Sequence, residues 1–144
     1  MRRGLAVLLV SAAVVACGPG VWISRDDAIS RSKAEKGWAR GQPAVSGVTR
    51  TDAKLMTWPD FMRASQVQSA ASYAPPGKQR VWLVAVSGDV HYGPQGAHEH
   101  WVIFIYNAVT GAQIGRLLGP FDQTTGEAIG SDWPDLWSSF PNAG

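Results

Sequence analysis

All three histidines of the chain lie in one polar stretch, residues 89–100, which also carries two carboxylates. His98 and His100 would project to the same side of an extended backbone, because successive side chains of a strand alternate between its faces. With His91 or Glu99 they could complete a zinc or copper site, since imidazole and carboxylate are ligands for these ions. The spacing matches no established metal-binding motif, and the stretch contains glycine and proline with no evident scaffold. Exposed, solvated histidines are therefore the favoured interpretation, and a metal site is the alternative.

The only cysteine, Cys17, ends an N-terminal segment with the features of a secretion signal. Two arginines, Arg2 and Arg3, precede an uncharged run, residues 5–16. A membrane-spanning helix needs about 20 apolar residues, so this shorter run is typical of a signal peptide. The residues Val-Val-Ala-Cys at 14–17 resemble the bacterial lipobox, in which the cysteine receives a lipid. A secreted protein with a free thiol is the alternative.

These features divide the N-terminal region into two parts. We predict a lipoprotein signal peptide over 1–16 and a spacer over 17–22 that begins at the lipidated Cys17. The lipid would anchor the mature protein on the extracytoplasmic face of the cell membrane. Because the chain has one cysteine, no disulfide can form within it, and burial of apolar side chains must hold the fold together.

Composition and motifs argue against several classes of function. Without Arg2 and Arg3 the chain carries 11 basic and 11 acidic residues, so it lacks the positive charge typical of nucleic-acid binding. It contains no Gly-x-Ser-x-Gly elbow, no His-Glu-x-x-His motif and no glycine-rich phosphate-binding loop. We therefore expect a non-enzymatic protein without a cofactor, which acts by binding, with another envelope protein as the expected partner.

The C-terminal tail, residues 119–144, carries an apolar stripe at helical spacing: Trp133, Leu136, Trp137 and Phe140. Pro134 suits the first turn of a short final helix. Such stripes are usually packing surfaces, so docking on the sheet is the favoured interpretation. The alternative is an exposed patch, centred on Trp133 and Trp137, for a peptidase, a glycan or another envelope partner.

Two apolar stretches, 81–88 and 101–106, must form the core that positions these side chains. Both are rich in β-branched and aromatic residues, which predicts neighbouring strands. The first stretch is apolar on both of its faces, so it should be a central strand with helices on at least one side. Turn formers at 107–111 predict a hairpin that leads into a return strand at 112–118.

Helices are predicted on both sides of an extended region. Ser24 and Asp27 have the spacing of a capping box, and the helix they begin should run to about Lys36, with Ala28, Ile29 and Trp38 as its apolar positions. Residues 42–57 read as one long broken strand or two short ones. Thr57 and Asp60 repeat the capping-box spacing, which predicts a short helix over 57–63, followed by a connector to residue 79.

In order and spacing, three of these segments resemble PepSY-like domains, which are named for the propeptides of thermolysin-type metallopeptidases and a spore-germination protein. The segments are the opening helix with an Ile-Ser-x-x-x-Ala-Ile pattern at 23–29, the strand 81–88, and the Asn-Ala-Val-Thr-Gly hairpin at 107–111, where the family usually has aspartate in place of Asn107. The resemblance spans 23–118 and leaves the tail outside it.

The resemblance implies an α+β fold in which an N-terminal helix packs on a small antiparallel sheet, with short additional helices. It also implies a protein that is not catalytic and that chaperones or inhibits a peptidase, or serves as a lipid-anchored module. A metal-binding envelope protein, with the histidine stretch as its site, is the alternative function.

Overall fold

The computed structural model describes residues 22–65, 79–91 and 96–143, and its fold is α+β. An antiparallel sheet with the strand order β1-β2-β3-β4 forms the middle layer. Its strands are β1 (Val45–Thr57), β2 (Arg80–Val90), β3 (Glu99–Asn107) and β4 (Gln113–Leu118). The helices are α2 (Arg25–Ala34), α3 (Trp58–Ser65) and the 3-10 helix η4 (Asp135–Ser139). The predicted signal peptide, residues 1–16, and the predicted lipidation site, Cys17, lie outside the described residues.

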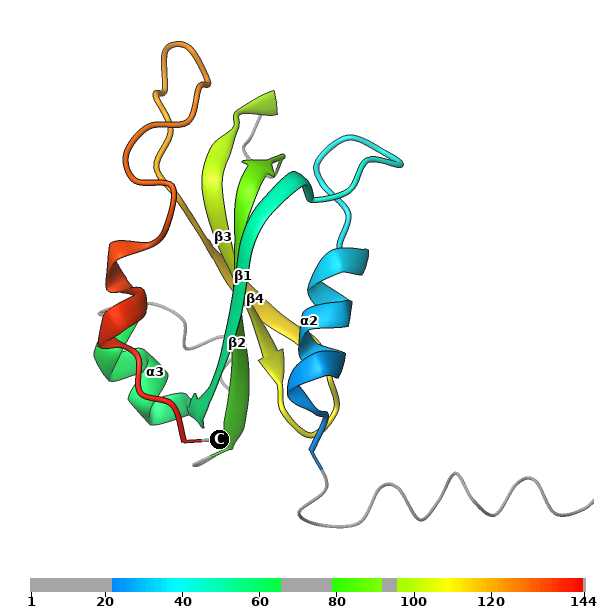
Figure 1. Cartoon of the computed structure of the whole chain (residues 1–144), viewed down its shortest axis with the longest axis vertical. Coiled ribbons are helices and arrows are strands. Elements are labelled where there is room, and N and C mark those ends of the chain that lie inside the picture. Colours follow the sequence, from blue (N-terminus) through cyan, green and yellow to red (C-terminus); the bar gives the residue numbers. More distant parts are fainter. Residues whose placement is uncertain (1–21, 66–78, 92–95, 144) are drawn as a thin grey trace, which may run out of the picture.

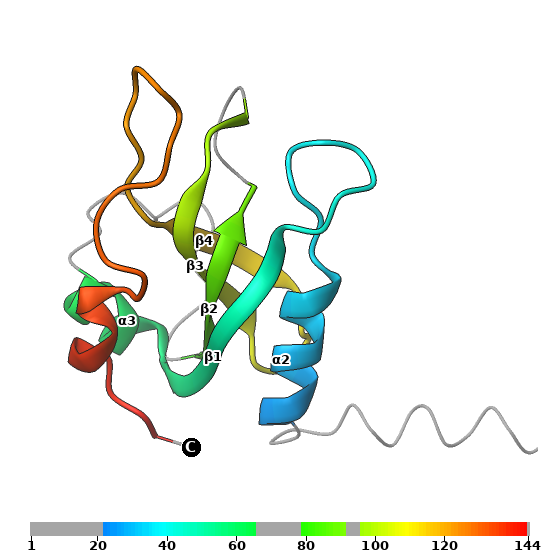
Figure 2. The ribbon, with the colours of Figure 1, turned by 45° about the horizontal axis from the view of Figure 1, so that its top comes forward.

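One face of the sheet packs against α2 (Figures 1 and 2). Ala28 of α2 is fully buried against strand residues that include Val84 and Phe104, and the indole Nε1 of Trp82 donates to the carbonyl oxygen of Ile23 at 2.9 Å. The predicted helix on a small antiparallel sheet is therefore confirmed.

The opposite face is covered by α3 and by the C-terminal tail with η4 (Figure 1). The rings of Phe61 and Phe140 stack at 5.9 Å between centroids, which joins α3 to the tail. Because both faces are covered, every side chain from Val81 to Ser87 in β2 is buried. This confirms that β2 is a central strand with two apolar faces.

The start of α2 follows the predicted capping chemistry, whereas at α3 only the hydroxyl of Thr57 accepts from the amide of Asp60, at 3.3 Å. Ser24 Oγ accepts a hydrogen bond from the amide of Asp27 at 3.0 Å, and a carboxylate oxygen of Asp27 accepts from the amide of Ser24 at 3.3 Å. Helix α2 ends at Ala34, two residues before the predicted end near Lys36, because the backbone of Glu35 is already extended. Trp38 therefore lies beyond the helix and is 66% exposed, so it does not belong to the apolar stripe.

Residues 42–57 supply a single long strand, β1, with an irregularity in its pairing to β2 between Ser46 and Arg50. Such a bulge adds residues to one strand and turns its side chains out of the regular alternation. The hairpin after β3 forms as predicted, with the amide of Gly111 donating to the carbonyl oxygen of Asn107 at 2.8 Å. Gly111 has φ of 73°, a conformation that favours glycine.

In the part of the chain that the structure describes, no helix is long and apolar enough to cross a membrane.

Candidate histidine cluster and tryptophan pocket

Two histidines and one carboxylate meet at the end of β2, and we call Asp89, His91 and His98 the histidine cluster. One oxygen of Asp89 lies 2.6 Å from Nδ1 of His98, and its other oxygen lies 3.3 Å from Nε2 of His91. The two imidazole rings lie edge to face, with their centroids 4.8 Å apart. One ligand atom from each of the three residues lies within 4.8 Å of the others.

Backbone hydrogen bonds from two separate segments hold the cluster. The amide of His91 donates to the carbonyl oxygen of Ala44, and the amide of Trp38 donates to the carbonyl oxygen of His91, both at 2.8 Å. The amide of His98 donates to the carbonyl oxygen of Gly126 at 2.8 Å. The two histidines are therefore positioned by the α2–β1 connection and the C-terminal tail, which supply the scaffold that the local sequence lacks.

The predicted ligand set was wrong in two of its members. β3 begins at Glu99, so His98 precedes the strand, and the alternation that would align it with His100 does not apply. Nδ1 of His100 instead lies 3.7 Å from a carboxylate oxygen of Asp132 in the tail. Glu99 is 1% exposed and is not part of the cluster. The structure thus brings His91 and His98 together with Asp89.

The arrangement can hold a metal ion with its remaining coordination positions open. Imidazole and carboxylate are ligands of zinc, and a site with three protein ligands leaves a position for water or a further ligand. The side chains of Asp89, His91 and His98 are 54%, 22% and 45% exposed, so an ion can reach them from solvent. Ser46 Oγ lies 2.9 Å from Nε2 of His91, and an ion bound at this nitrogen would replace that hydrogen bond.

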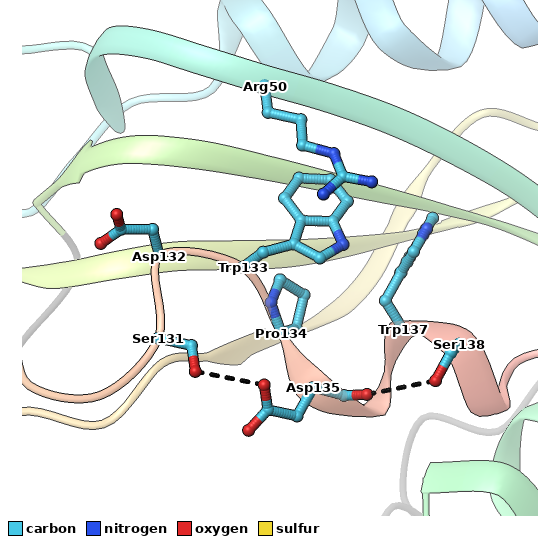
Figure 3. A pocket seen from close by; sticks show the side chains of 8 residues that line it. All are labelled: Arg50, Ser131, Asp132, Trp133, Pro134, Asp135, Trp137 and Ser138. Carbon is cyan, nitrogen blue, oxygen red and sulfur yellow. Dashed lines mark hydrogen bonds between the residues drawn. The ribbon is translucent and has the colours of Figure 1, made fainter.

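A second site lies on the tail side of the sheet, and we call it the tryptophan pocket (Figure 3). It is an open cavity of about 470 Å³ lined by Arg50, Ser131, Asp132, Trp133, Pro134, Asp135, Trp137 and Ser138. The guanidinium of Arg50 lies over the indole of Trp133, 3.8 Å from the ring centroid. The rings of Trp133 and Trp137 meet edge to face at 5.8 Å.

Of the two tryptophans at the centre of the predicted aromatic patch, Trp137 is packed in the core and Trp133 lies partly at the surface. Trp137 is 5% exposed, and its Nε1 donates to a carboxylate oxygen of Asp52 at 2.9 Å, so this residue is not an exposed anchor. Phe140 is buried as well, which agrees with docking of the tail on the sheet. Trp133 is half-buried and keeps part of its ring at the surface of the pocket.

A serine, a histidine and an aspartate also share a small cavity of about 220 Å³, lined in part by Ser87, His100 and Asp132. The hydroxyl of Ser87 donates to the carbonyl oxygen of Asp132 at 2.5 Å. Within the described residues it makes no hydrogen bond to the imidazole of His100. A nucleophilic serine needs a base within hydrogen-bond reach of its hydroxyl, and this serine instead holds the tail against β2.

Sequence reasoning missed two groups, Asp89 in the cluster and Arg50 in the pocket. Asp89 precedes His91 by two residues, and this spacing was the available signal, since two such residues share a side of an extended backbone. Nothing local pointed to Arg50, because 83 positions separate it from its partner Trp133.

No family model matches the chain, and neither the curated proteins nor the solved structures contain a significant match.

Proposed function

We propose that the protein is a non-catalytic, lipid-anchored protein of the bacterial envelope that binds a divalent transition-metal ion, zinc in the first instance. The metal proposal rests on one observation: the carboxylate of Asp89 lies between the imidazoles of His91 and His98 and is close to both. The imidazole nitrogens and the carboxylate oxygen can bind a metal ion only where they carry no proton. Binding would therefore release protons and weaken at acidic pH.

Zinc suits these ligands better than calcium or magnesium, which prefer sites made of oxygen atoms alone. The exposed position of the cluster also suits an ion that is taken up and released. A buried structural zinc site is usually closed by four protein ligands.

Zinc titration of tag-free protein tests the metal proposal. An ion that binds only the folded state stabilises it by about 2.7 kcal/mol at a hundredfold excess over its Kd, so the melting temperature should rise. The response should be lost in His91→Ala and His98→Ala and weakened in Asp89→Asn. His100→Ala is the matched control, because His100 points to Asp132 and should leave the response intact. A protein that does not respond to zinc, or a control as impaired as the cluster variants, would contradict the proposal.

The lipid anchor is proposed from the sequence alone, through the lipobox-like residues at 14–17. Mass spectrometry of the N-terminal peptide from the membrane fraction should find a lipid on Cys17. An unmodified Cys17, or cleavage at another residue, would show that the anchor was wrongly assigned.

Binding of a peptidase is the second candidate function. In support of this, α2 packs across a small antiparallel sheet, the arrangement that the PepSY-like resemblance implies, and the 107–111 hairpin joins β3 to β4. Purified protein should then slow peptide hydrolysis by a thermolysin-type enzyme or improve the yield of its refolding. If neither changes, the peptidase proposal fails while the metal proposal stands.

A further inference from the structure

The tryptophan pocket has the size and the walls of a binding site for a small organic group. Cavities that hold such groups commonly measure about 300–1,000 Å³ and combine aromatic surface with a few fixed polar groups. This pocket measures about 470 Å³, and the indoles of Trp133 and Trp137 supply its aromatic surface. Trp137 is fixed by its hydrogen bond to Asp52, so this wall is rigid.

Arg50 supplies hydrogen-bond donors at the edge of the pocket. Its guanidinium lies over the indole ring of Trp133. In the described part of the chain, this guanidinium forms no ion pair and no hydrogen bond. A guanidinium carries five N–H donors in a rigid plane. Stacking on the indole therefore fixes the orientation of these donors and leaves them available to hydrogen-bond a ligand (Figure 3).

Carboxylates that can accept hydrogen bonds also line the same pocket. The carboxylate of Asp135 accepts from Ser131 Oγ at 3.1 Å, which orients it while leaving further lone pairs for a ligand. Asp132 also lines the pocket, and its side chain is 90% exposed. With two carboxylates and one guanidinium, the pocket disfavours an anionic ligand.

A sugar fits this combination, because each hydroxyl both donates and accepts and the C–H face of the ring packs on an indole. We infer that the tryptophan pocket binds one or two neutral sugar residues of a glycan, with Trp133 as the platform and Arg50 and Asp135 as the polar contacts. This site is separate from the histidine cluster and does not depend on the proposed metal.

Titration with three neutral disaccharides, diacetylchitobiose, cellobiose and maltose, tests the inference by calorimetry and tryptophan fluorescence. At least one should bind, and Trp133→Ala and Arg50→Ala should each weaken it by about tenfold or more, a difference of about 1.4 kcal/mol. Trp38→Ala is the matched control, since it removes an exposed tryptophan outside the pocket and should leave binding unchanged. Arg50 is exposed, so its variant remains folded even where loss of Trp133 disturbs the tail.

Three results would overturn the inference. The first is that none of the disaccharides binds to folded protein. The second is binding that survives both pocket substitutions or is lost in Trp38→Ala. The third is that a blocked trialanine peptide binds with the expected dependence on Trp133 and Arg50 while the sugars do not, which would make the pocket a peptide site.

Discussion

Asp52 of β1 joins the two layers that cover the sheet. One carboxylate oxygen accepts from Arg25 of α2 at 3.1 Å, and the other accepts from Trp137 of η4 at 2.9 Å. The amide of Ala53 donates to the same carboxylate at 2.8 Å. Burial alone would raise the pKa of Asp52, but the hydrogen bonds from Trp137, Ala53 and Arg25 outweigh it and hold the pKa below its ordinary value.

This lowered pKa predicts a loss of stability in acid. A carboxyl group with a lower pKa in the folded state stabilises the fold above its unfolded pKa, about 3.9, and the contribution disappears as the pH falls through the folded value. Asp52→Asn should therefore reduce the free energy of unfolding at neutral pH and flatten its fall below about pH 4. Urea unfolding at a series of pH values measures this, with the exposed Glu127→Gln as the control. Equal pH slopes in Asp52→Asn and the parent would contradict the assignment.

At the scale of single side chains, the sequence predicted which residues could bind a metal but not which of them meet. His91 and His98 come together because Ala44 and Gly126, from distant segments, hold their backbones. No local pattern contains those contacts, so the sequence favoured a solvated loop. Arg50 was missed for the same reason, since its contact with Trp133 depends on the path of the tail, whereas the spacing of Asp89 from His91 was a local signal.

Among the elements, α2 depends on its N-terminal cap. Ser24→Ala removes the hydroxyl that accepts from the Asp27 amide and should cost about 1 kcal/mol, the usual value for loss of an N-cap. Ser30→Ala changes an exposed serine inside the helix and serves as the control, because alanine favours a helix interior. Urea denaturation should separate the two variants, and similar midpoints would indicate that the cap contributes little.

The central strand β2 should not tolerate a charge on either face. Val84→Asp lies in the core beneath α2 and Leu83→Asp in the core beneath the tail, and both positions are fully buried. An unpaired buried carboxylate costs several kcal/mol against a total stability of about 5–15 kcal/mol, so both variants should unfold. Val48→Asp makes the same change at an exposed position and should melt close to the parent. Melting of either core variant at the parental temperature would show that this strand is not the core.

The elements were predicted from the sequence more reliably than the sites. Capping at Ser24 and the two apolar faces at 81–88 are local patterns, and both appear in the structure. Trp38 was misassigned because helical spacing continues past Ala34 in the sequence, whereas the chain turns at Glu35. That turn is fixed by the pairing of Lys36 with Pro43 and by the close approach of Gly37 to the carbonyl oxygen of His91.

The whole molecule depends on its C-terminal tail as a third layer. Lys54 of β1 donates from Nζ to the carbonyl oxygens of Trp137 and Phe140, at 2.7 and 2.9 Å, and the amide of Ala143 donates to Leu55 at 2.7 Å. The tail therefore covers a face of the sheet and part of the outer edge of β1, where unpaired backbone groups would otherwise invite association.

Trp137→Ala should accordingly destabilise the protein strongly. Removal of a buried tryptophan typically costs about 3–5 kcal/mol, and here it also leaves the Asp52 carboxylate without its Nε1 donor. Trp38→Ala, at an exposed tryptophan, should stay within about 0.5 kcal/mol of the parent. Chemical denaturation measures the difference, and a small effect of Trp137→Ala would mean that the tail is not part of the folded core.

The described chain begins at one end of the sheet. In an anchored protein, this end of the domain would lie nearest to the bilayer. Ile23 donates its amide to the carbonyl oxygen of Ala108, beside the β3–β4 hairpin, while the histidine cluster lies at the opposite end of β2 (Figure 1). From Cys17 to Trp22 the backbone spans at most about 17 Å, so the proposed lipid would keep the hairpin end close to the membrane. The cluster lies the length of β2, roughly 30 Å, from that end of the sheet, so the proposed anchor and the proposed metal site would be at opposite ends of the domain.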